Sequence, residues 1–242
     1  MIFPRKIVFL FLPFVLLGFS FCEPAPAKKN DEFAGKSDSL VYLNHHDSAK
    51  YVGILTCRQC HQQIYNTFIE TGMGKSFDAA TRQKSSASVS SKGVYDRFLD
   101  LHYAALWKSD SLFIREFRLN EKKDTSYVRD EQVNYVIGSG QHTNSHLQTV
   151  NGYVNQMPMT WYTQKKKWDL PPGFEDGVNT RFSRKIGLEC MSCHNAYPDF
   201  VMGSENKFTH LPSGIDCERC HGPGSIHVAQ RSSEPMIDTA RY

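Results

Sequence analysis

The 242-residue sequence has almost no cysteine outside a repeated pattern: six of its seven Cys form three closely spaced pairs, and Cys22 is left over. It also lacks a block of Lys and Arg with interleaved aromatic residues, which argues against a nucleic-acid-binding protein. The N-terminal apolar run, residues 7–21, has fifteen residues and contains Pro13, so it is too short for a comfortable membrane span. No separate group of catalytic residues stands out, so the paired cysteines are the residues from which the chemistry of the protein can be inferred.

The Cys pairs share one pattern, in which two residues separate the thiols and a His follows the second Cys directly. The three copies are Cys57-Arg58-Gln59-Cys60-His61, Cys190-Met191-Ser192-Cys193-His194 and Cys217-Glu218-Arg219-Cys220-His221. This C-x-x-C-H pattern is the attachment signature of c-type haem. Two thiols three positions apart can form thioethers with the two vinyl groups of one porphyrin, and the following His becomes the proximal iron ligand. The sequence therefore predicts three haem c groups.

Zinc and disulfide chemistry are the alternatives, because two C-x-x-C pairs can also build a four-cysteine zinc site. A redox dithiol or a disulfide, however, needs no His directly after the second Cys. The sequence has ten His, so a His follows a given Cys by chance in about 4% of cases, and three in a row occur roughly once in ten thousand. We therefore favour haem.

Residues 1–22 are predicted to be a signal peptide. Arg5 and Lys6 form a basic start, and the apolar run follows them. Cys22 comes directly after that run, which predicts a lipoprotein signal with Cys22 as the acylated N-terminus. Phe21 departs from the small residue usual at that place, so ordinary cleavage nearby and an uncleaved anchor remain alternatives. We expect an exported protein on the periplasmic side of the membrane.

Residues 23–50 are rich in Pro, Ala, Lys, Asp and Ser, which predicts a flexible tether with His45 and His46 exposed near its end. Removing residues 1–21 takes away two basic residues, so 28 − 2 = 26 Lys and Arg face 25 acids and the net charge is +1. Each ferric haem adds two propionates and one residual positive charge, so three haems add about −3. The basic excess of the sequence is therefore poor evidence for a nucleic-acid partner.

The first haem segment is expected to span residues 51–91. Apolar residues recur there at helical spacing and predict a helix ended by Gly72: Ile64, Tyr65, Phe68 and Ile69. Met73 follows, and its thioether is a candidate distal iron ligand. The alternative is a Met that fills a gap in the core, which is the commoner use of this residue.

Residues 92–180 are predicted to form a β-rich insertion. Residues 108–111 are expected to be the turn of one hairpin, between the runs 99–106 and 112–119. Asn151-Gly152 suits a type I′ turn and predicts a second hairpin. Pro158 in its returning strand indicates either an edge strand or a bulge.

Further His residues are candidate distal ligands. His142 follows Gly138-Ser139-Gly140, where glycines allow the backbone to approach a flat ligand closely, and we favour it as a ligand over a structural His. His146 would face the same side as His142 if the stretch is extended. His227 stands just after the turn Gly222-Pro223-Gly224, and we favour it as a ligand over a surface His. His210 is a weaker candidate, and His102 is expected to be structural.

Residues 181–242 are expected to form the segment of the second and third haems, which should be near neighbours because only 27 positions separate Cys190 from Cys217. With this segment, the chain resembles the multihaem c-type cytochrome family related to cytochrome c-554, in particular the branch that often carries tetratricopeptide repeats. The resemblance rests on Tyr51-Val52-Gly53, Gly72-Met73-Gly74-Lys75-Ser76-Phe77, Ile137-Gly138-Ser139-Gly140, Cys193-His194-Asn195-Ala196-Tyr197-Pro198, Gly214-Ile215-Asp216-Cys217 and Cys220-His221-Gly222-Pro223-Gly224.

The resemblance implies an α+β multihaem cytochrome with short haem-binding helices and loops around the β-rich insertion. It also implies closely stacked, mostly six-coordinate haems that relay electrons. Members of that branch commonly have a fourth C-x-x-C-H soon after the third. The sequence reaches Tyr242 without one, so we expect a fragment or a short member.

Two functions follow. The first is an electron-transfer cytochrome, for which 10 − 3 = 7 further His are enough to give every iron a second ligand. Its partners would be redox proteins and, through the lipid anchor, a membrane, with no nucleic acid. The second is an oxidoreductase of a small nitrogen or sulfur compound, which needs one iron with an open distal side. The Lys-for-His proximal substitution of some such enzymes is absent, and we favour electron transfer.

Overall fold

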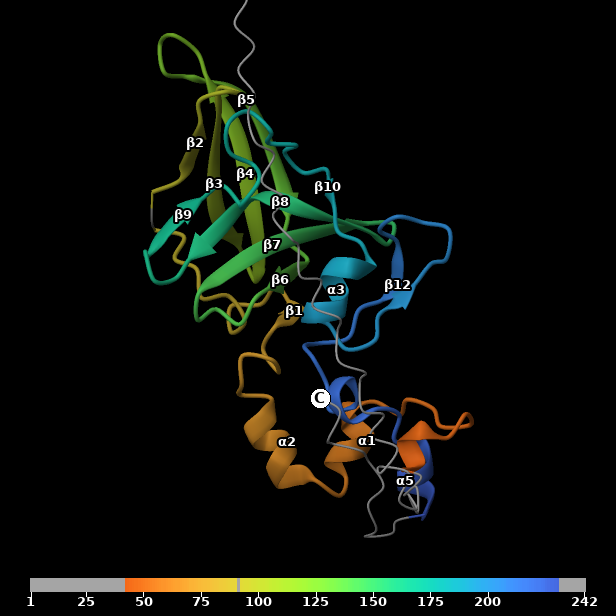
Figure 1. Ribbon diagram of the computed structural model, residues 1–242. Helices are drawn as coiled ribbons and strands as arrows, with labels where there is room; N and C mark the ends of the chain where they lie inside the picture. The colour runs from red at the N-terminus through yellow and green to blue at the C-terminus, as the bar shows by residue number, and fades with distance from the viewer. Residues whose placement is uncertain (1–41, 91, 231–242) are drawn as a thin grey trace, which may run out of the picture. The chain divides into compact units, whose positions relative to one another are not determined.

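The computed structural model describes residues 42–90 and 92–230 (Figure 1). The predicted signal peptide, Cys22 and most of the predicted tether lie outside these residues. The described part is mixed α+β and rich in strands, with short helices, as expected. None of its helices is long and apolar enough to cross a membrane.

The first sheet is antiparallel throughout and has the strand order β1-β6-β7-β8-β10, with β9 also paired to β8. Its strands are β1 (Phe77–Ala79), β6 (Tyr135–Ile137), β7 (Thr143–Val150), β8 (Tyr153–Tyr162), β9 (Lys167–Asp169) and β10 (Arg184–Lys185). Two of them, β1 and β10, lie outside the predicted insertion. Both segments that flank the predicted insertion, residues 92–180, therefore supply strands to its sheet.

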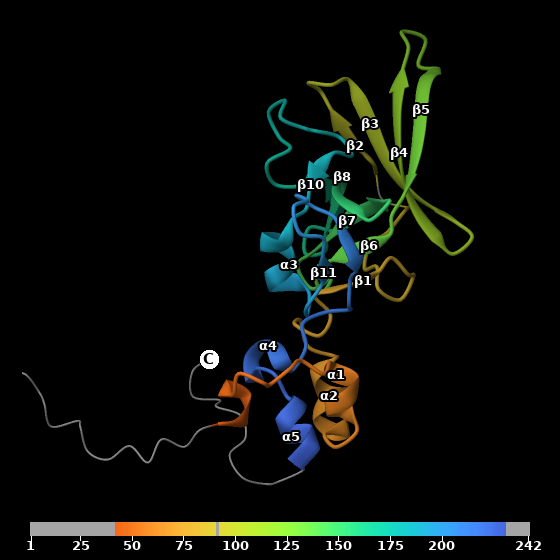
Figure 2. The ribbon, with the colours of Figure 1, turned by 90° about the vertical axis from the view of Figure 1, so that its right-hand side faces the viewer.

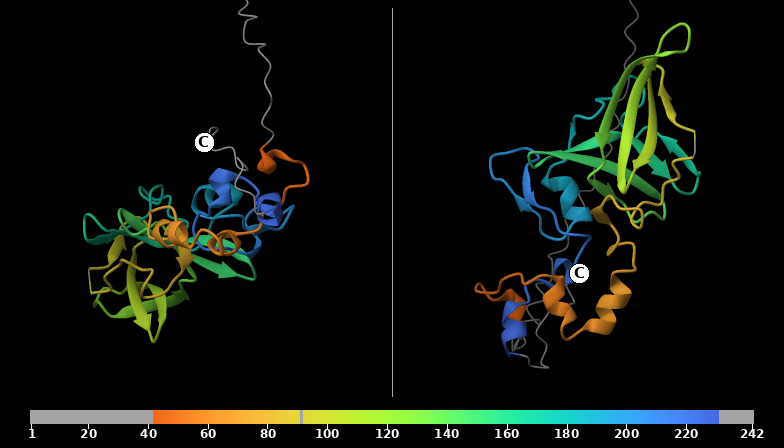
Figure 3. Two further views of the ribbon diagram at one scale, coloured as in Figure 1. Left: turned by 90° about the horizontal axis from the view of Figure 1, so that it is seen from below. Right: turned by 180° about the vertical axis from the view of Figure 1, so that it is seen from behind.

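The second sheet is an antiparallel meander, in which β2, β3, β4 and β5 pair in chain order. Its strands are β2 (Val94–Asp96), β3 (Leu101–Lys108), β4 (Ser111–Leu119) and β5 (Thr125–Gln132). Figure 3 shows these strands side by side from behind. The hairpin predicted around residues 108–111 is confirmed by the pairing of Lys108 with Ser111.

The β7–β8 hairpin is also confirmed. Asn151 and Gly152 have φ values of 52° and 84°, the left-handed conformations that a type I′ turn requires. Opposite Pro158 the register shifts, because Ser145 pairs with Thr160 but Leu147 pairs with Gln156. Pro158 therefore lies in a bulge of an interior strand, where its missing N–H breaks no ladder bond, and the edge-strand alternative was wrong.

The main core lies between the two sheets. Buried residues alternate with partly exposed ones along β3, where Leu101, Tyr103 and Ala105 point inward, as expected for a strand with one covered face. They pack with residues of β8 and β9, including Met159, Trp161, and Trp168. The second sheet is thus fixed on one face of the first.

A second core covers another part of the first sheet. Its buried members include Leu147 of β7, Val154 of β8 and Phe208 of β12 (Phe208–His210), which pairs with β11 (Asp199–Phe200). Met191 belongs to the same cluster and is completely buried. Because Met191 lies between the two cysteines of the second motif, that motif packs against the first sheet.

The remaining elements are short helices: η2 (Leu43–His45), α1 (Ile54–Arg58), α2 (Gln62–Phe68), α3 (Leu188–His194), α4 (Glu218–His221) and α5 (Ser225–Gln230). Figure 2 shows α1, α4 and α5 close together. The η2 turn lies within the predicted tether, residues 23–50. Asn44 is buried there and donates a hydrogen bond of 2.8 Å to the carbonyl of His221, so the chain is structured before residue 50. His45 and His46 are exposed, as expected.

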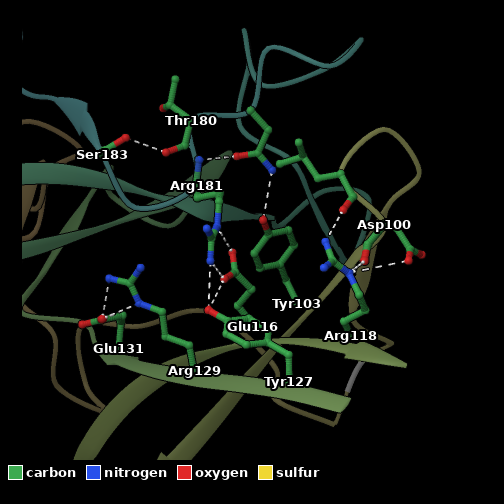
Figure 4. Close-up of polar contacts among 12 residues, drawn as sticks. Asp100, Tyr103, Glu116, Arg118, Tyr127, Arg129, Glu131, Thr180, Arg181 and Ser183 are labelled. Atoms are coloured by element: carbon green, nitrogen blue, oxygen red, sulfur yellow. Dashed lines mark hydrogen bonds and ion pairs between the residues drawn. The ribbon is translucent and has the colours of Figure 1, made fainter. Parts of the chain in front are cut away.

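One charged side chain, Glu116, is completely buried on the inner side of β4. Arg181 Nε donates to its Oε2 at 2.8 Å, and Tyr127 donates to its Oε1 at 3.0 Å (Figure 4). Burial raises the pKa of Glu116, but the hydrogen bonds and charge of Arg181 outweigh burial, so the pKa is lowered overall. The ion pair fastens the segment that leads to α3 onto the second sheet.

Candidate haem-attachment site

Each C-x-x-C-H motif is wound into a helical turn. The backbone N–H of His61 donates to the carbonyl of Cys57 at 2.9 Å, and that of His221 donates to Cys217 at 2.9 Å. The second motif lies within α3. Residues three and four positions apart share one face of a helix. Both thiols and the imidazole of each motif are therefore presented on the same side, which is the arrangement that covalent attachment of haem requires.

The cysteines also fit this chemistry, because the six motif thiols are free and none is paired in a disulfide. The second Cys of every motif, namely Cys60, Cys193 and Cys220, is exposed. Within residues 42–90 and 92–230, no three or more His, Cys, Asp or Glu side chains gather into a metal site of their own. A four-cysteine zinc site would be such a group.

The first and third motifs lie side by side. The thiols of Cys57 and Cys217 influence each other, and this mutual interaction is the largest cause of the raised pKa of Cys57 and of the lowered pKa of Cys217. Glu218 holds the two segments together. Its buried carboxylate accepts hydrogen bonds from the backbone N–H groups of Gly53 at 2.7 Å and Gly224 at 2.8 Å. The attachment points of the two motifs are thus fixed relative to each other.

Two imidazoles face each other across this junction. The ring centroids of His61 and His227 are 6.1 Å apart, and their planes differ by 18°. Two imidazoles on opposite sides of one metal, each with its nitrogen roughly 2 Å from it, have centroids about 6 Å apart. Burial, and then the nearby His61, lower the pKa of His227, which favours the neutral ring that ligates iron. The spacing therefore fits a haem iron held between His61 and His227.

The second motif is joined to the other two by hydrogen bonds. Ser76, which follows the first motif, donates to the carbonyl of His194 at 2.7 Å. Tyr197 donates to the carbonyl of Glu218 in the third motif at 3.2 Å. Burial, and then the charge of Lys84, lower the pKa of His194, so this imidazole is also favoured in its neutral form. These contacts join the segments of the second and third motifs, and the expectation that their haems are near neighbours stays a prediction.

Two other candidate ligands lie on loops. Met73 is 50% exposed, so it does not fill a core gap in the described chain, and its carbonyl accepts a hydrogen bond from Ile215 at 3.1 Å. His142 is exposed just before β7, and its Nδ1 lies 2.8 Å from the side-chain nitrogen of Gln164. No described imidazole is seen to stack on His142. Both residues stay predictions as iron ligands.

The remaining His residues have other environments. His146 is completely buried and its Nδ1 lies 3.1 Å from the carbonyl of Met159, so it belongs to the core between the sheets and does not share the exposed position of His142. His102 stacks between the rings of Tyr95 and Phe117, the structural position expected of it. His210 is exposed at the end of β12.

Sequence reasoning missed two long-range contacts near the motifs, those of Glu218 and Lys84. Glu218 occupies a variable position of its C-x-x-C-H motif, and its partners Val52 and Gly53 are distant in the sequence. Lys84 lies in a Ser-rich stretch that contains no motif. No local signal marks either residue, because their roles come from long-range contacts.

A family model described as "Cytochrome c554 and c-prime" matches residues 145–222, which include the second and third motifs but not the first. The match supports c-type haem as cofactor and haem-based electron transfer for this region. It gives no indication of tetratricopeptide repeats. No curated protein and no solved structure matches the chain.

Proposed function

We propose that this chain is a multihaem c-type cytochrome that carries three haems and relays electrons between redox partner proteins. The observation that carries the proposal is the facing pair His61 and His227 at 6.1 Å, beside a complete C-x-x-C-H motif. An iron with two imidazole ligands has no open position for a substrate, and such a haem is suited to electron transfer. The relay is therefore favoured over an enzyme.

The chain's own residues hold and insulate the cofactors. Each motif supplies two thiols for thioether bonds and one proximal imidazole: His61, His194 or His221. The bound haems supply reversible one-electron chemistry. Met191 and the first sheet hold the second motif, whereas Glu218 holds the first and third motifs together. His142 and Met73 are the proposed distal ligands for the other two irons.

The proposed location is the periplasmic side of a membrane. Proteins with c-type haem are extracytoplasmic, and the predicted signal at residues 1–22 would direct export. Acylation of Cys22 would anchor the protein and leave the haem segments facing soluble or membrane-bound redox partners. Metabolic labelling with a fatty acid, compared between the wild type and Cys22→Ala, tests the anchor. Equal labelling of both proteins would contradict it.

Carbon monoxide tests the relay, because it binds ferrous haem only where a distal position is open. The dithionite-reduced wild type should show little spectral change with carbon monoxide, whereas His227→Ala should bind it at one haem. His102→Ala is the matched control, since His102 stacks between Tyr95 and Phe117 on the second sheet, and it should behave as the wild type. A large change in the wild type would favour the oxidoreductase of a small nitrogen or sulfur compound.

A further inference from the structure

Lys84 is a half-buried cation beside the second motif. Its ammonium donates a hydrogen bond of 2.8 Å to the carbonyl of Gly138 and a second one to the carbonyl of Lys75. Both acceptors are neutral. No ion pair in the described part of the chain includes Lys84. Its positive charge is therefore held in place without being cancelled by a carboxylate in contact with it.

Three hydrogen-bonded segments fix this ammonium close to His194. Ser76 is buried, its carbonyl accepts from the backbone N–H of Gly138 at 2.6 Å, and its hydroxyl donates to the carbonyl of His194 at 2.7 Å. The two carbonyls that hold Lys84 are thus next to Ser76. Lys75 precedes Ser76 in the chain, and Gly138 donates a hydrogen bond to the carbonyl of Ser76. The ammonium of Lys84 therefore belongs to the same hydrogen-bonded cluster as the backbone carbonyl of His194.

The charge is present at neutral pH. Burial lowers the pKa of Lys84 to about 8, and the carboxylate of Asp78 opposes part of that effect. Most of the molecules are therefore protonated at pH 7. Burying a cation without an ion-pair partner is unfavourable, so an anion or a gain in electron density near Lys84 would be stabilised.

We propose that Lys84 is a positioning residue that raises the reduction potential of the haem attached at Cys190 and Cys193, by holding a positive charge beside His194. This inference rests on the proposed function, because it needs a haem at the second motif. When that iron accepts one electron from a donor and passes from ferric to ferrous, its net charge falls by one. A fixed cation nearby favours the reduced form. The second haem would therefore hold an electron more readily than it would without Lys84.

Spectroelectrochemical titration of the holoprotein tests the proposal at pH 7. His194→Met, which replaces a His ligand by a thioether and so shifts that haem upward, first identifies which component of the wild-type curve is the second haem. In Lys84→Gln the same component should become harder to reduce by about tenfold in its equilibrium constant, which is about 59 mV for one electron. The other two components should keep their wild-type values.

Two variants separate charge from structure. Lys84→Arg keeps the cation and should restore the wild-type potential. Lys122→Gln removes an exposed charge in the turn after β4 and should leave all three components unchanged. A purely structural role for Lys84 would lower thermal stability in Lys84→Gln without a selective shift in potential, and that result would overturn the proposal. If the wild type lacks haem at the second motif, the proposed function itself fails.

Discussion

Replacing His146 by Phe should remove most of the loss of folding stability that this buried imidazole causes at low pH. Burial lowers the pKa of His146 from its ordinary value of 6.5 to about 4, while a hydrogen bond to the carbonyl of Met159 opposes part of this effect. Between these pH values the unfolded chain binds a proton at this residue and the folded chain does not. The free energy of unfolding therefore falls as the pH drops through this range. At roughly 1.4 kcal/mol for each pH unit, the loss is about 3 kcal/mol by pH 4.

The assay is urea unfolding followed by far-ultraviolet circular dichroism at several pH values from 7.5 to 4. His146→Phe should be less stable than the wild type at pH 7, since the carbonyl of Met159 loses its partner. The difference between the two proteins should then shrink by about 3 kcal/mol, or reverse, as the pH approaches 4. Phe117→Leu is the control. It changes an aromatic residue of β4 and no titratable group, so the variant should keep the wild-type slope.

A wild-type pH slope in His146→Phe would refute this reasoning. It would mean that the imidazole titrates equally in the folded and unfolded chains and is not sealed in the core between the two sheets. Because acidic residues such as Glu116 also titrate at low pH in both proteins, the comparison uses the difference between the slopes and not the slope of either protein alone.

Three further variants test the supports of the site. Arg181→Met leaves the carboxylate of Glu116 buried without its cation and should cost about 2 to 3 kcal/mol at pH 7, less than for a fully buried pair because Arg181 is 40% exposed, as measured by urea unfolding. That destabilisation should diminish as the pH falls through the lowered pKa of Glu116; an effect that does not change with pH would count against the ion pair. Met191→Ala opens a cavity under α3 and should lower the free energy of unfolding by about 2 to 4 kcal/mol. A loss no larger than that caused by replacing an exposed Met would show that Met191 is not packed in the core. Cys57→Ala should weaken or remove the first haem alone on a stained denaturing gel, and loss of all the stain would contradict independent attachment.

Local patterns were sufficient to predict the hairpins and the motifs. The β7–β8 hairpin depends on Asn151 and Gly152, which adopt the turn by their own conformational preferences. The pairing of β1 with β6 and of β10 with β8 could not be predicted in the same way, because each joins segments far apart in the sequence. The η2 turn was missed for a similar reason, since Asn44 is buried by a distant partner, His221.

In the candidate site, too, contiguous features could be predicted and long-range contacts could not. The attachment residues could be predicted because a C-x-x-C-H motif is contiguous. The glycine turn before His227 indicated a ligand for a neighbouring haem, but the sequence did not reveal that His61 is the imidazole it faces. Glu218 and Lys84 act through backbone groups of distant segments, and a single sequence contains no signal for such contacts.

The most direct test of the central claim is the haem content of the purified, exported protein, measured by pyridine haemochrome and by iron analysis on the same sample. Three covalently bound haems and three irons in each chain are expected, one for each C-x-x-C-H motif. A colourless protein, or one that contains zinc in place of iron, would contradict the account.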